Sequence, residues 1–473
     1  MTSLELQSSS SRQDKSEEVS GTKADIDLIE SAEHGQQGAI YAESMTAHLP
    51  KAHRDYLMER HGTLELDPIP TLNVGMQDAA YLTSLQIAIL GVAPLFWKPL
   101  SNRYGRRPIF LLSLICSLVC NVGCAKSTTY ASMAACRALV SFFISPASAI
   151  GSAIVMETTF KKDRGRYMGV WTLLITLGVP VGPFIFGFVT YRAGYQWIFW
   201  ILAMINGGQF ILYLFFGPET RYLGSGINSK DSARKIEYMS LRRIDPTPFS
   251  WFEFVSPLTM ARHPSILIPA CAYAMVFLFG SVLTTVEVPH LLQEKFGLNS
   301  EQLGMQFLGA IIGSVIGEQM GGILSDFWMS RRSRRIGGKA EPEFRLWLSY
   351  FGFALAIIGV IVFLVCTQES PSGHWTVSPI IGTAIAAVGN QLVTTVMITY
   401  AVDCFPREAG NIGVFITFVR QIWGFIGPFW FTPMFENAGV APSAGIGSAL
   451  IVIVSVIPTV FLHWRGKGWR SEE

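Results

Sequence analysis

In the segment "KPLSNRYGRRPIFLLSLI", residues 98–115, four basic residues lie within ten positions between two apolar runs. The whole chain is 50% apolar and only 15% charged over its 473 residues, whereas a soluble protein carries about 25% charged residues. Apolar runs of roughly 20 residues, the length that crosses a bilayer, recur along it. Because backbone amides in hydrocarbon must be satisfied within their own segment, each run must be a helix. The sequence therefore predicts an all-α integral membrane protein.

The apolar runs predict about eleven spans, five before a polar segment and six after it. The expected divisions are a polar, largely disordered N-terminal head (1–78), a first helix bundle (79–216), a cytosolic middle loop (217–265), a second helix bundle (266–463) and a cytosolic tail (464–473). The head is too poor in apolar residues to fold alone and lacks the apolar core of a secretory signal. The expected spans are Ala79–Trp97, Ile109–Ala125, Tyr130–Val155, Tyr167–Tyr191, Trp197–Phe216, Ile266–Pro289, Leu303–Leu324, Leu346–Cys366, Val377–Val402, Ile412–Phe435 and Gly445–Leu462.

Basic residues gather in every second loop, which sets the orientation of the chain. They follow the first, third, fifth, seventh, ninth and eleventh spans, and the remaining loops hold at most one each. Basic loops face the cytosol. The first span then runs inward and the polar head lies outside, with no signal to take it there. Either the head is translocated, or a span is missing between Asp67 and Gln77.

The composition excludes several classes of function. The net charge of +2 does not suggest a nucleic-acid partner. None of the seven cysteines has the paired spacing of a zinc site. Cys116, Cys120 and Cys124 share a helix face and could form a thiolate ligand set, but no histidine or carboxylate lies beside them, which favours packing. The chain has neither a catalytic histidine cluster nor a phosphate-binding loop. We therefore expect no enzyme activity, no metal and no cofactor.

The two groups of spans repeat each other. "KPLSNRYGRR" after the first span corresponds to "GGILSDFWMSRRSRR" after the seventh, and "LGVPVGPFIFG" corresponds to "IWGFIGPFWF". Internal repeats of this kind are typical of secondary transporters.

These repeats resemble the major facilitator superfamily, over the chain from about Ala79 to Trp469. The family's loop motif reads Gly-x-x-x-Asp-Arg-x-Gly-Arg-Arg. Four of its positions match here, while Lys98 replaces the glycine and Asn102 replaces the acid; the second half keeps the glycine and the acid. The positions concerned are Lys98, Asn102, Arg103, Gly105, Arg106 and Arg107 in the first half, and Gly322 and Asp326 in the second.

A second motif is similar to that of the drug:proton antiporter branch. That motif has a Gly-x-x-x-Gly-Pro core with a later glycine pair. Gly178, Gly182, Pro183 and Gly187 match it, while Phe186 stands where the pair would begin. The segments "GPETRYL" and "PEFRLWL" resemble fungal members of that branch, of the general-substrate or polyamine type. The glycine–proline core lets helices approach and bend, either for packing alone or for transport.

The resemblance implies two six-helix bundles that rock about a central site by alternating access. It implies that the loop arginines bond helix C-termini and pair with carboxylates at the cytosolic face, where Glu157 is the expected partner in the first half. Family members have twelve spans. Here "LELDPIP" resembles the linker that precedes their first span, and "MQDAAYLTSLQ", which follows almost directly, resembles the approach to their second, so the first span is expected to be absent. We expect a skipped exon or a mis-joined gene model; a natural eleven-span protein is the alternative.

Polar residues at membrane depth are costly and are candidates for binding substrate or proton. The alternative is a structural role, such as a pair between Glu318 and Arg420. Gly309, Gly313, Gly317 and Gly321 recur every four residues and predict a groove for a neighbouring backbone. The candidate set is Gln86, Asn206, Gln209, Glu287, Glu318, Asn390, Gln391, Arg420 and Gln421.

The function predicted is a proton-coupled secondary transporter of small organic solutes, acting as a monomer in the plasma membrane. Carboxylates among aromatic rings suit organic cations, such as drugs or polyamines, because a cation is attracted to a ring face. The expected partners are the solute, the proton and the lipid bilayer. The alternative is a non-transporting sensor on a carrier scaffold, or an inactive truncated transporter.

Overall fold

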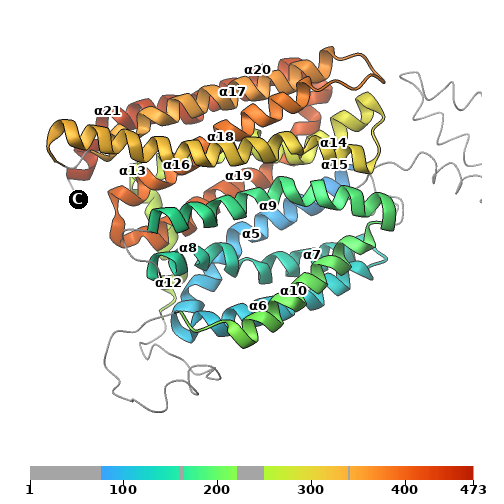
Figure 1. The fold of residues 1–473 in the computed structure, drawn as a ribbon, viewed down its shortest axis with the longest axis horizontal. Coiled ribbons are helices and arrows are strands. Elements are labelled where there is room, and N and C mark those ends of the chain that lie inside the picture. Colours follow the sequence, from blue (N-terminus) through green and yellow to red (C-terminus); the bar gives the residue numbers. More distant parts are fainter. Residues whose placement is uncertain (1–75, 159–163, 221–249, 339–340, 472–473) are drawn as a thin grey trace, which may run out of the picture. The chain divides into compact units, whose positions relative to one another are not determined.

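The computed structural model describes residues 76–158, 164–220, 250–338 and 341–471 (Figure 1). Every regular element in these ranges is a helix, and eleven helical stretches are long and apolar enough to cross a membrane. This confirms the eleven predicted spans. Most of the predicted head and much of the middle loop, including the stretch where a further span was sought, lie outside the described residues.

The first half contains six long helices, two of which form one span. Because α7 and α8 are separated only at Ser145, they are the two parts of the third span. The helices are α5 (Met76–Tyr104), α6 (Arg106–Ala125), α7 (Tyr130–Ile144), α8 (Pro146–Thr158), α9 (Arg164–Ala193) and α10 (Gln196–Phe216).

The second half begins with short helical turns and continues with six spans. Two of the spans contain a π-helical turn, at Leu278–Val282 (η2) and Val452–Val456 (η5). The helices are α12 (Phe252–Val255), η1 (Ser256–Arg262), α13 (Pro264–Phe277), α14 (Leu283–Phe296), α15 (Ser300–Gln306), α16 (Leu308–Ile336), η3 (Pro342–Arg345), α17 (Leu346–Glu369), α18 (Ser378–Cys404), η4 (Pro406–Glu408), α19 (Ala409–Ala438), α20 (Val440–Ile451) and α21 (Ile457–Ser471).

Two predicted boundaries are wrong. The arginine cluster 331–335 was expected in a loop but continues α16, which ends only where Gly337 takes a left-handed conformation at φ 68°. The expected tail from residue 464 likewise continues α21 to Ser471. The apolar pattern ends where hydrocarbon ends, whereas a helix continues into the polar region until a residue such as glycine stops it.

Glycines set the packing of the second half. A Cβ atom on Gly309, Gly313 or Gly317 would meet a backbone carbonyl of α18 at 2.5, 2.2 or 2.7 Å. On the opposite side of α18, a Cβ on Gly382 or Gly389 would meet a backbone nitrogen of α17 at 2.4 Å. The predicted glycine groove is therefore confirmed, and α18 is held between α16 and α17.

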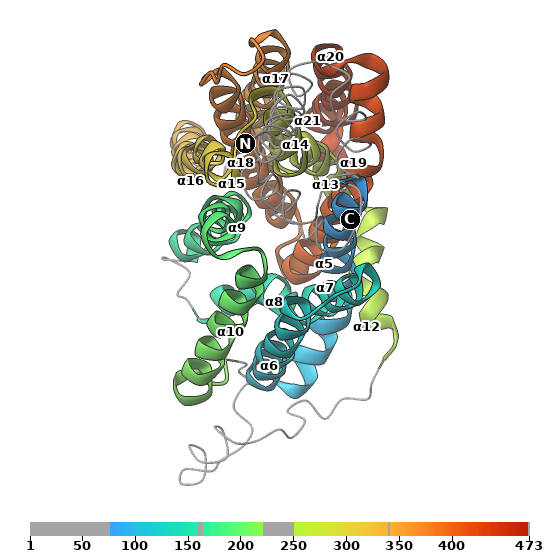
Figure 2. The same ribbon diagram turned by 90° about the vertical axis from the view of Figure 1, so that its right-hand side faces the viewer.

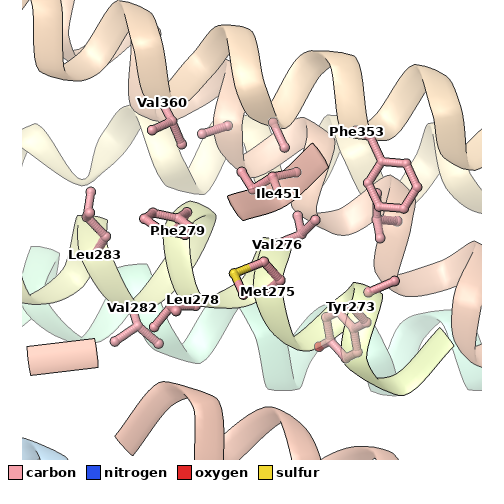
Figure 3. Close-up of a cluster of buried hydrophobic side chains, with 14 of the residues drawn as sticks. Tyr273, Met275, Val276, Leu278, Phe279, Val282, Leu283, Phe353, Val360 and Ile451 are labelled. Carbon is pink, nitrogen blue, oxygen red and sulfur yellow. The ribbon is translucent and has the colours of Figure 1, made fainter. Parts of the chain in front are cut away.

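The largest buried apolar cluster lies in this half. Figure 3 shows part of it, where Phe279 and Leu283 lie with Phe353 and Val360 of α17 and Ile451 of α20. The first half has two smaller clusters, around Met133 and around Trp97. The halves contact each other chiefly where α5 lies against α19 and where α9 lies against α15 and α16 (Figure 2). These pairs position the candidate site.

Candidate functional site

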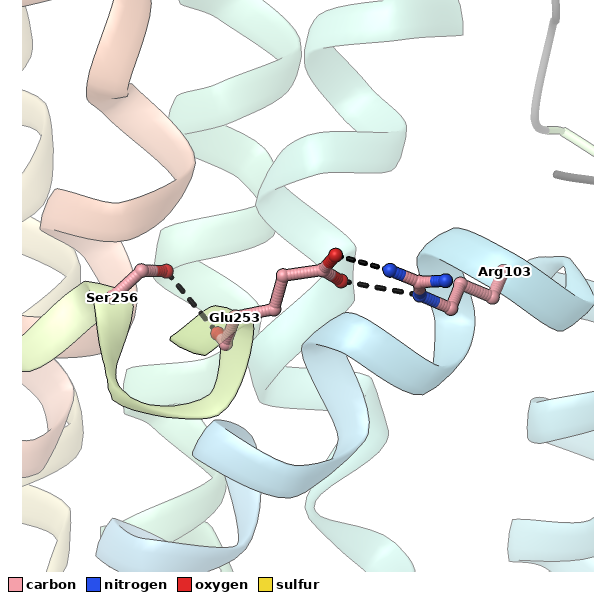
Figure 4. Close-up of polar contacts among 3 residues, drawn as sticks. All are labelled: Arg103, Glu253 and Ser256. Carbon is pink, nitrogen blue, oxygen red and sulfur yellow. Dashed lines mark hydrogen bonds and ion pairs between the residues drawn. The ribbon is translucent and has the colours of Figure 1, made fainter. Parts of the chain in front are cut away.

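The loop motif of the first half is a compact set of charged contacts. Gly105 has a φ of 91°, which a residue with a side chain would adopt only with strain, so the motif requires glycine at the turn between α5 and α6. Arg103 is buried and forms a two-bonded ion pair with Glu253 of α12 (Figure 4), with its Nε 3.2 Å from the carboxylate. The Glu253 carbonyl accepts a hydrogen bond from the Ser256 hydroxyl. The end of α5 is thereby tied to the segment that leads into the second half.

A second carboxylate stabilises the start of α6. Glu219, just after α10, accepts hydrogen bonds of 3.0 Å from the backbone N–H groups of Arg106 and Arg107. These are two of the N–H groups that a helix start leaves unpaired. The Arg107 guanidinium in turn donates to the Leu214 carbonyl in the last turn of α10, at 2.8 Å. The arginine thus bonds a helix C-terminus, which is the kind of contact that the resemblance implies.

Lys98, where the family has glycine, reaches the other half. Its ammonium bonds the side-chain oxygen of Asn411, at the start of α19, and Asn411 donates to Glu408. Asn102 lies half-buried in the last turn of α5. The expected partner Glu157 lies in α8, but its side chain is outside the described residues.

In the second half, Asp326, the acidic residue of the loop motif, pairs with a residue of its own helix bundle. Arg345 lies 3.8 Å from Asp326 and 3.2 Å from Asp403, and it donates to the Ser325 hydroxyl at 2.6 Å. Gly322 has open space around it, with nothing within 4 Å of a Cβ.

The antiporter-like motif divides into two parts. A Cβ on Gly187 would meet the Ser300 carbonyl at 2.7 Å and the Gly304 Cα at 3.0 Å, so α9 and α15 touch backbone to backbone. A Cβ on Gly304 would likewise meet the Pro183 carbonyl at 3.2 Å. Gly178 and Gly182 have nothing within 4 Å and do not take part in this approach.

Glu318 is buried on α16 and is bonded to α18. It accepts hydrogen bonds from the Gln391 amide at 3.0 Å and from the Thr395 hydroxyl at 3.4 Å. The alternative of a pair between Glu318 and Arg420 is wrong. Arg420 donates instead to the Tyr273 hydroxyl at 2.9 Å, with its guanidinium 4.7 Å from the centre of the Phe277 ring.

The other candidates are not all brought together. Glu287 is buried on α14, 3.8 Å from His290 one turn later. Gln421 is buried on α19 and lies against Gly91 of α5. On α10, which packs on α6 and α9, Asn206 is buried and Gln209 is exposed. Gln86 is half-buried on α5.

A hollow lies between the halves, about midway along the spans. It holds a cavity of about 20 Å³, room for about one water-sized group, and is partly open to the surroundings. Six of its lining residues carry a hydroxyl or an amide and none is charged: Thr176 of α9, Ser281 of η2, Thr284 and Thr285 of α14, Ser314 of α16 and Asn390 of α18. We call this hollow the inter-bundle pocket. Of its polar residues, the sequence singled out only Asn390, because lone threonines and serines in apolar runs carry no signal of their own.

Two halves that repeat each other, eleven spans and a polar pocket between the halves define a membrane carrier of small molecules. The family model described as Major Facilitator Superfamily matches residues 62–428. The chain belongs to this superfamily, so it is a multi-pass membrane transporter rather than an enzyme.

Individual relatives agree in class and differ in solute. The chain is 24% identical to citrate exporter 1 of Aspergillus niger over 429 residues, covering 85% of this chain and 82% of the relative. It is 26% identical to a probable drug/proton antiporter of Saccharomyces cerevisiae over 391 residues, covering 81% and 75%. Among solved structures, the human organic anion transporter MFSD10 shares the fold, with a TM-score of 0.55 and 16% identity over 91% of this chain and 92% of that chain.

Proposed function

We propose that this chain is a proton-coupled carrier of small organic solutes, chiefly organic cations such as drugs or polyamines, working by alternating access. The observation that carries the proton coupling is the Glu318 site. A buried carboxylate at membrane depth is costly, and such groups commonly serve in proton relays. The drug/proton relative supports the same class of mechanism.

The partner of Glu318 suits both protonation states. Gln391 donates from its amide nitrogen to the carboxylate, while its amide oxygen is buried without a hydrogen bond. An amide carries donors and an acceptor, so a turn of the Gln391 side chain would offer that oxygen to a protonated Glu318. The site can therefore take up and release a proton without leaving either form unbonded.

The charged contacts at the cytosolic ends supply the gate. Arg103 with Glu253 and Lys98 with Asn411 join the end of α5 to the second half. Both sets must break for the cytosolic side to open. Because the pocket is built from both halves of one chain, we infer that the monomer is the working unit. We propose the plasma membrane as its location, with the basic loops in the cytosol.

The test is proton-driven transport by the full chain in proteoliposomes, comparing the parent protein with Glu318→Gln. Glutamine keeps the size of the side chain and cannot carry the proton. We expect solute flux in response to a pH gradient to be lost in this variant, while Glu294→Gln, at an exposed carboxylate of α14, keeps it. Equal gradient-driven flux in Glu318→Gln would show that this carboxylate does not carry the proton.

The non-transporting alternative predicts a different outcome in the same assay. A sensor or an inactive carrier would bind solute without moving it, so the parent protein would give no flux under any gradient.

A further inference from the structure

Three of the six polar residues that line the inter-bundle pocket present hydrogen-bond acceptors rather than donors. The hydroxyls of Thr176, Thr284 and Thr285 each donate to a backbone carbonyl of their own helix, at 2.9, 2.9 and 2.8 Å. A threonine hydroxyl has one proton and two lone pairs, so these three residues have only lone pairs left to offer. The hydroxyls held by the backbone thus give the pocket a fixed acceptor character.

The remaining polar residues can adapt to a ligand. Asn390 is 4% exposed, and its side-chain oxygen makes no hydrogen bond. A buried polar atom without a partner is costly, and a bound donor would remove that cost. Ser281 and Ser314 line the same pocket. The pocket therefore gains most from a ligand group that is rich in donors.

Two buried carboxylates lie one helical turn from the pocket. Glu318 follows Ser314 by four residues on α16, and Glu287 follows Thr284 by three residues on α14. Residues at these spacings share a helix face. Of the residues that line the pocket none is a cation, so the local field favours a positive ligand over a negative one.

We propose that the inter-bundle pocket is a subsite for a primary or secondary ammonium group, recognised through its N–H donors. An ammonium group has donors and no acceptor, which complements the threonine lone pairs. A quaternary ammonium has the same charge but no N–H group, and its usual recognition is a cage of aromatic rings. The pocket has one aromatic side chain, Phe307, and does not form such a cage. This inference rests on the proposed function and narrows its solute class.

The test is ligand binding by the full chain in detergent, which needs no gradient. The probes are putrescine, its hexamethylated analogue, 1,4-butanediol and succinate, which all have a four-carbon chain. We expect putrescine to bind, and the hexamethylated analogue to bind roughly tenfold more weakly, the loss that one charge-assisted hydrogen bond accounts for. Butanediol should bind weakly and succinate not at all.

Two variants show whether the pocket is responsible. Thr284→Val removes an acceptor and keeps the shape, so putrescine binding should weaken roughly tenfold while binding of the hexamethylated analogue changes little. Thr367→Val is the matched control, because Thr367 makes the same kind of backbone bond on α17 outside the pocket. Equal affinity for putrescine and its hexamethylated analogue would overturn the proposal, as would tighter binding of succinate or butanediol.

The outcome is separable from that of the proton-coupling test. If putrescine binds as expected while Glu318→Gln keeps gradient-driven flux, the subsite stands and the proton assignment fails. If gradient-driven flux depends on Glu318 while succinate is the tighter ligand, the coupling stands and the ammonium subsite fails.

Discussion

Replacing Gly313 by alanine tests the packing that positions Glu318. The new Cβ would lie 2.2 Å from the Ala384 carbonyl oxygen and 3.0 Å from the Ala387 Cβ, where non-bonded carbon atoms prefer about 3.5–4.0 Å. Helix α18 cannot withdraw, because Gly382 and Gly389 already press on α17. Overpacking costs about 1–3 kcal/mol, and replacing glycine by alanine in a helix returns up to about 1 kcal/mol. We expect the upper end of the cost, a net loss of about 2 kcal/mol.

Thermal unfolding of the purified chain in detergent measures this effect, with Gly322→Ala as the matched control. Gly322 lies on the same helix and has nothing within 4 Å of a Cβ, so there alanine should leave the Tm unchanged or raise it. The two substitutions are chemically identical and are predicted to shift the Tm in opposite directions. A Tm for Gly313→Ala at or above that of the parent protein would refute the close approach of α16 and α18.

Two further predictions concern the contacts between the halves. Lys98→Met removes the bond to Asn411 and should shift the equilibrium of the carrier a few-fold toward the cytosol-open state. A hydrogen bond to a charged group contributes about 1.5–3 kcal/mol when it is buried and less at a half-exposed site such as this one. The shift is measured as faster labelling of Cys404 by a membrane-impermeant maleimide added on the cytosolic side, with Lys126→Met as the control. An unchanged labelling rate in Lys98→Met would contradict a gating role for Lys98. Gly187→Ala places a Cβ 2.7 Å from the Ser300 carbonyl and should slow transport by keeping α9 and α15 apart, whereas Gly169→Ala, in open space on α9, should not. Equal rates in these two variants would mean that the approach of α9 to α15 is not needed for transport.

Hydropathy and charge predicted the fold because they report directly on the bilayer. A run such as Leu346–Cys366 has to be a helix wherever its neighbours lie. The irregular points were not predictable in this way. The break at Ser145 comes directly before Pro146, and a proline disfavours a helical conformation at the residue before it, so local sequence rather than hydropathy accounts for this break. The π turn from Leu278 to Val282 lies inside an apolar segment that gives no such signal.

The sequence did not predict how the candidate residues pair. The spacing of Gly309, Gly313, Gly317 and Gly321 was sufficient to predict a groove, since a helix repeats every 3.6 residues. It could not say which helix fills the groove. Glu318 bonds Gln391 rather than Arg420 because the groove is filled by α18. The carboxylates Glu253 and Glu219, which bond the Arg103 side chain and the Arg106 backbone N–H, were not predicted either, because each lies more than 100 positions from its partner in the sequence.

The proposed proton site and the proposed ammonium subsite share the same two helices. Ser314 and Glu318 are one turn apart on α16, while Asn390 and Gln391 are adjacent on α18. An ionised Glu318 attracts an ammonium group in the pocket, and a protonated Glu318 does not, so proton and solute compete for one negative charge. Such competition is sufficient for exchange if the pocket changes sides only when one of them is bound. The other wall of the pocket is α9, the helix that approaches α15 at Gly187. We therefore expect occupancy of the pocket to act on this contact between the halves.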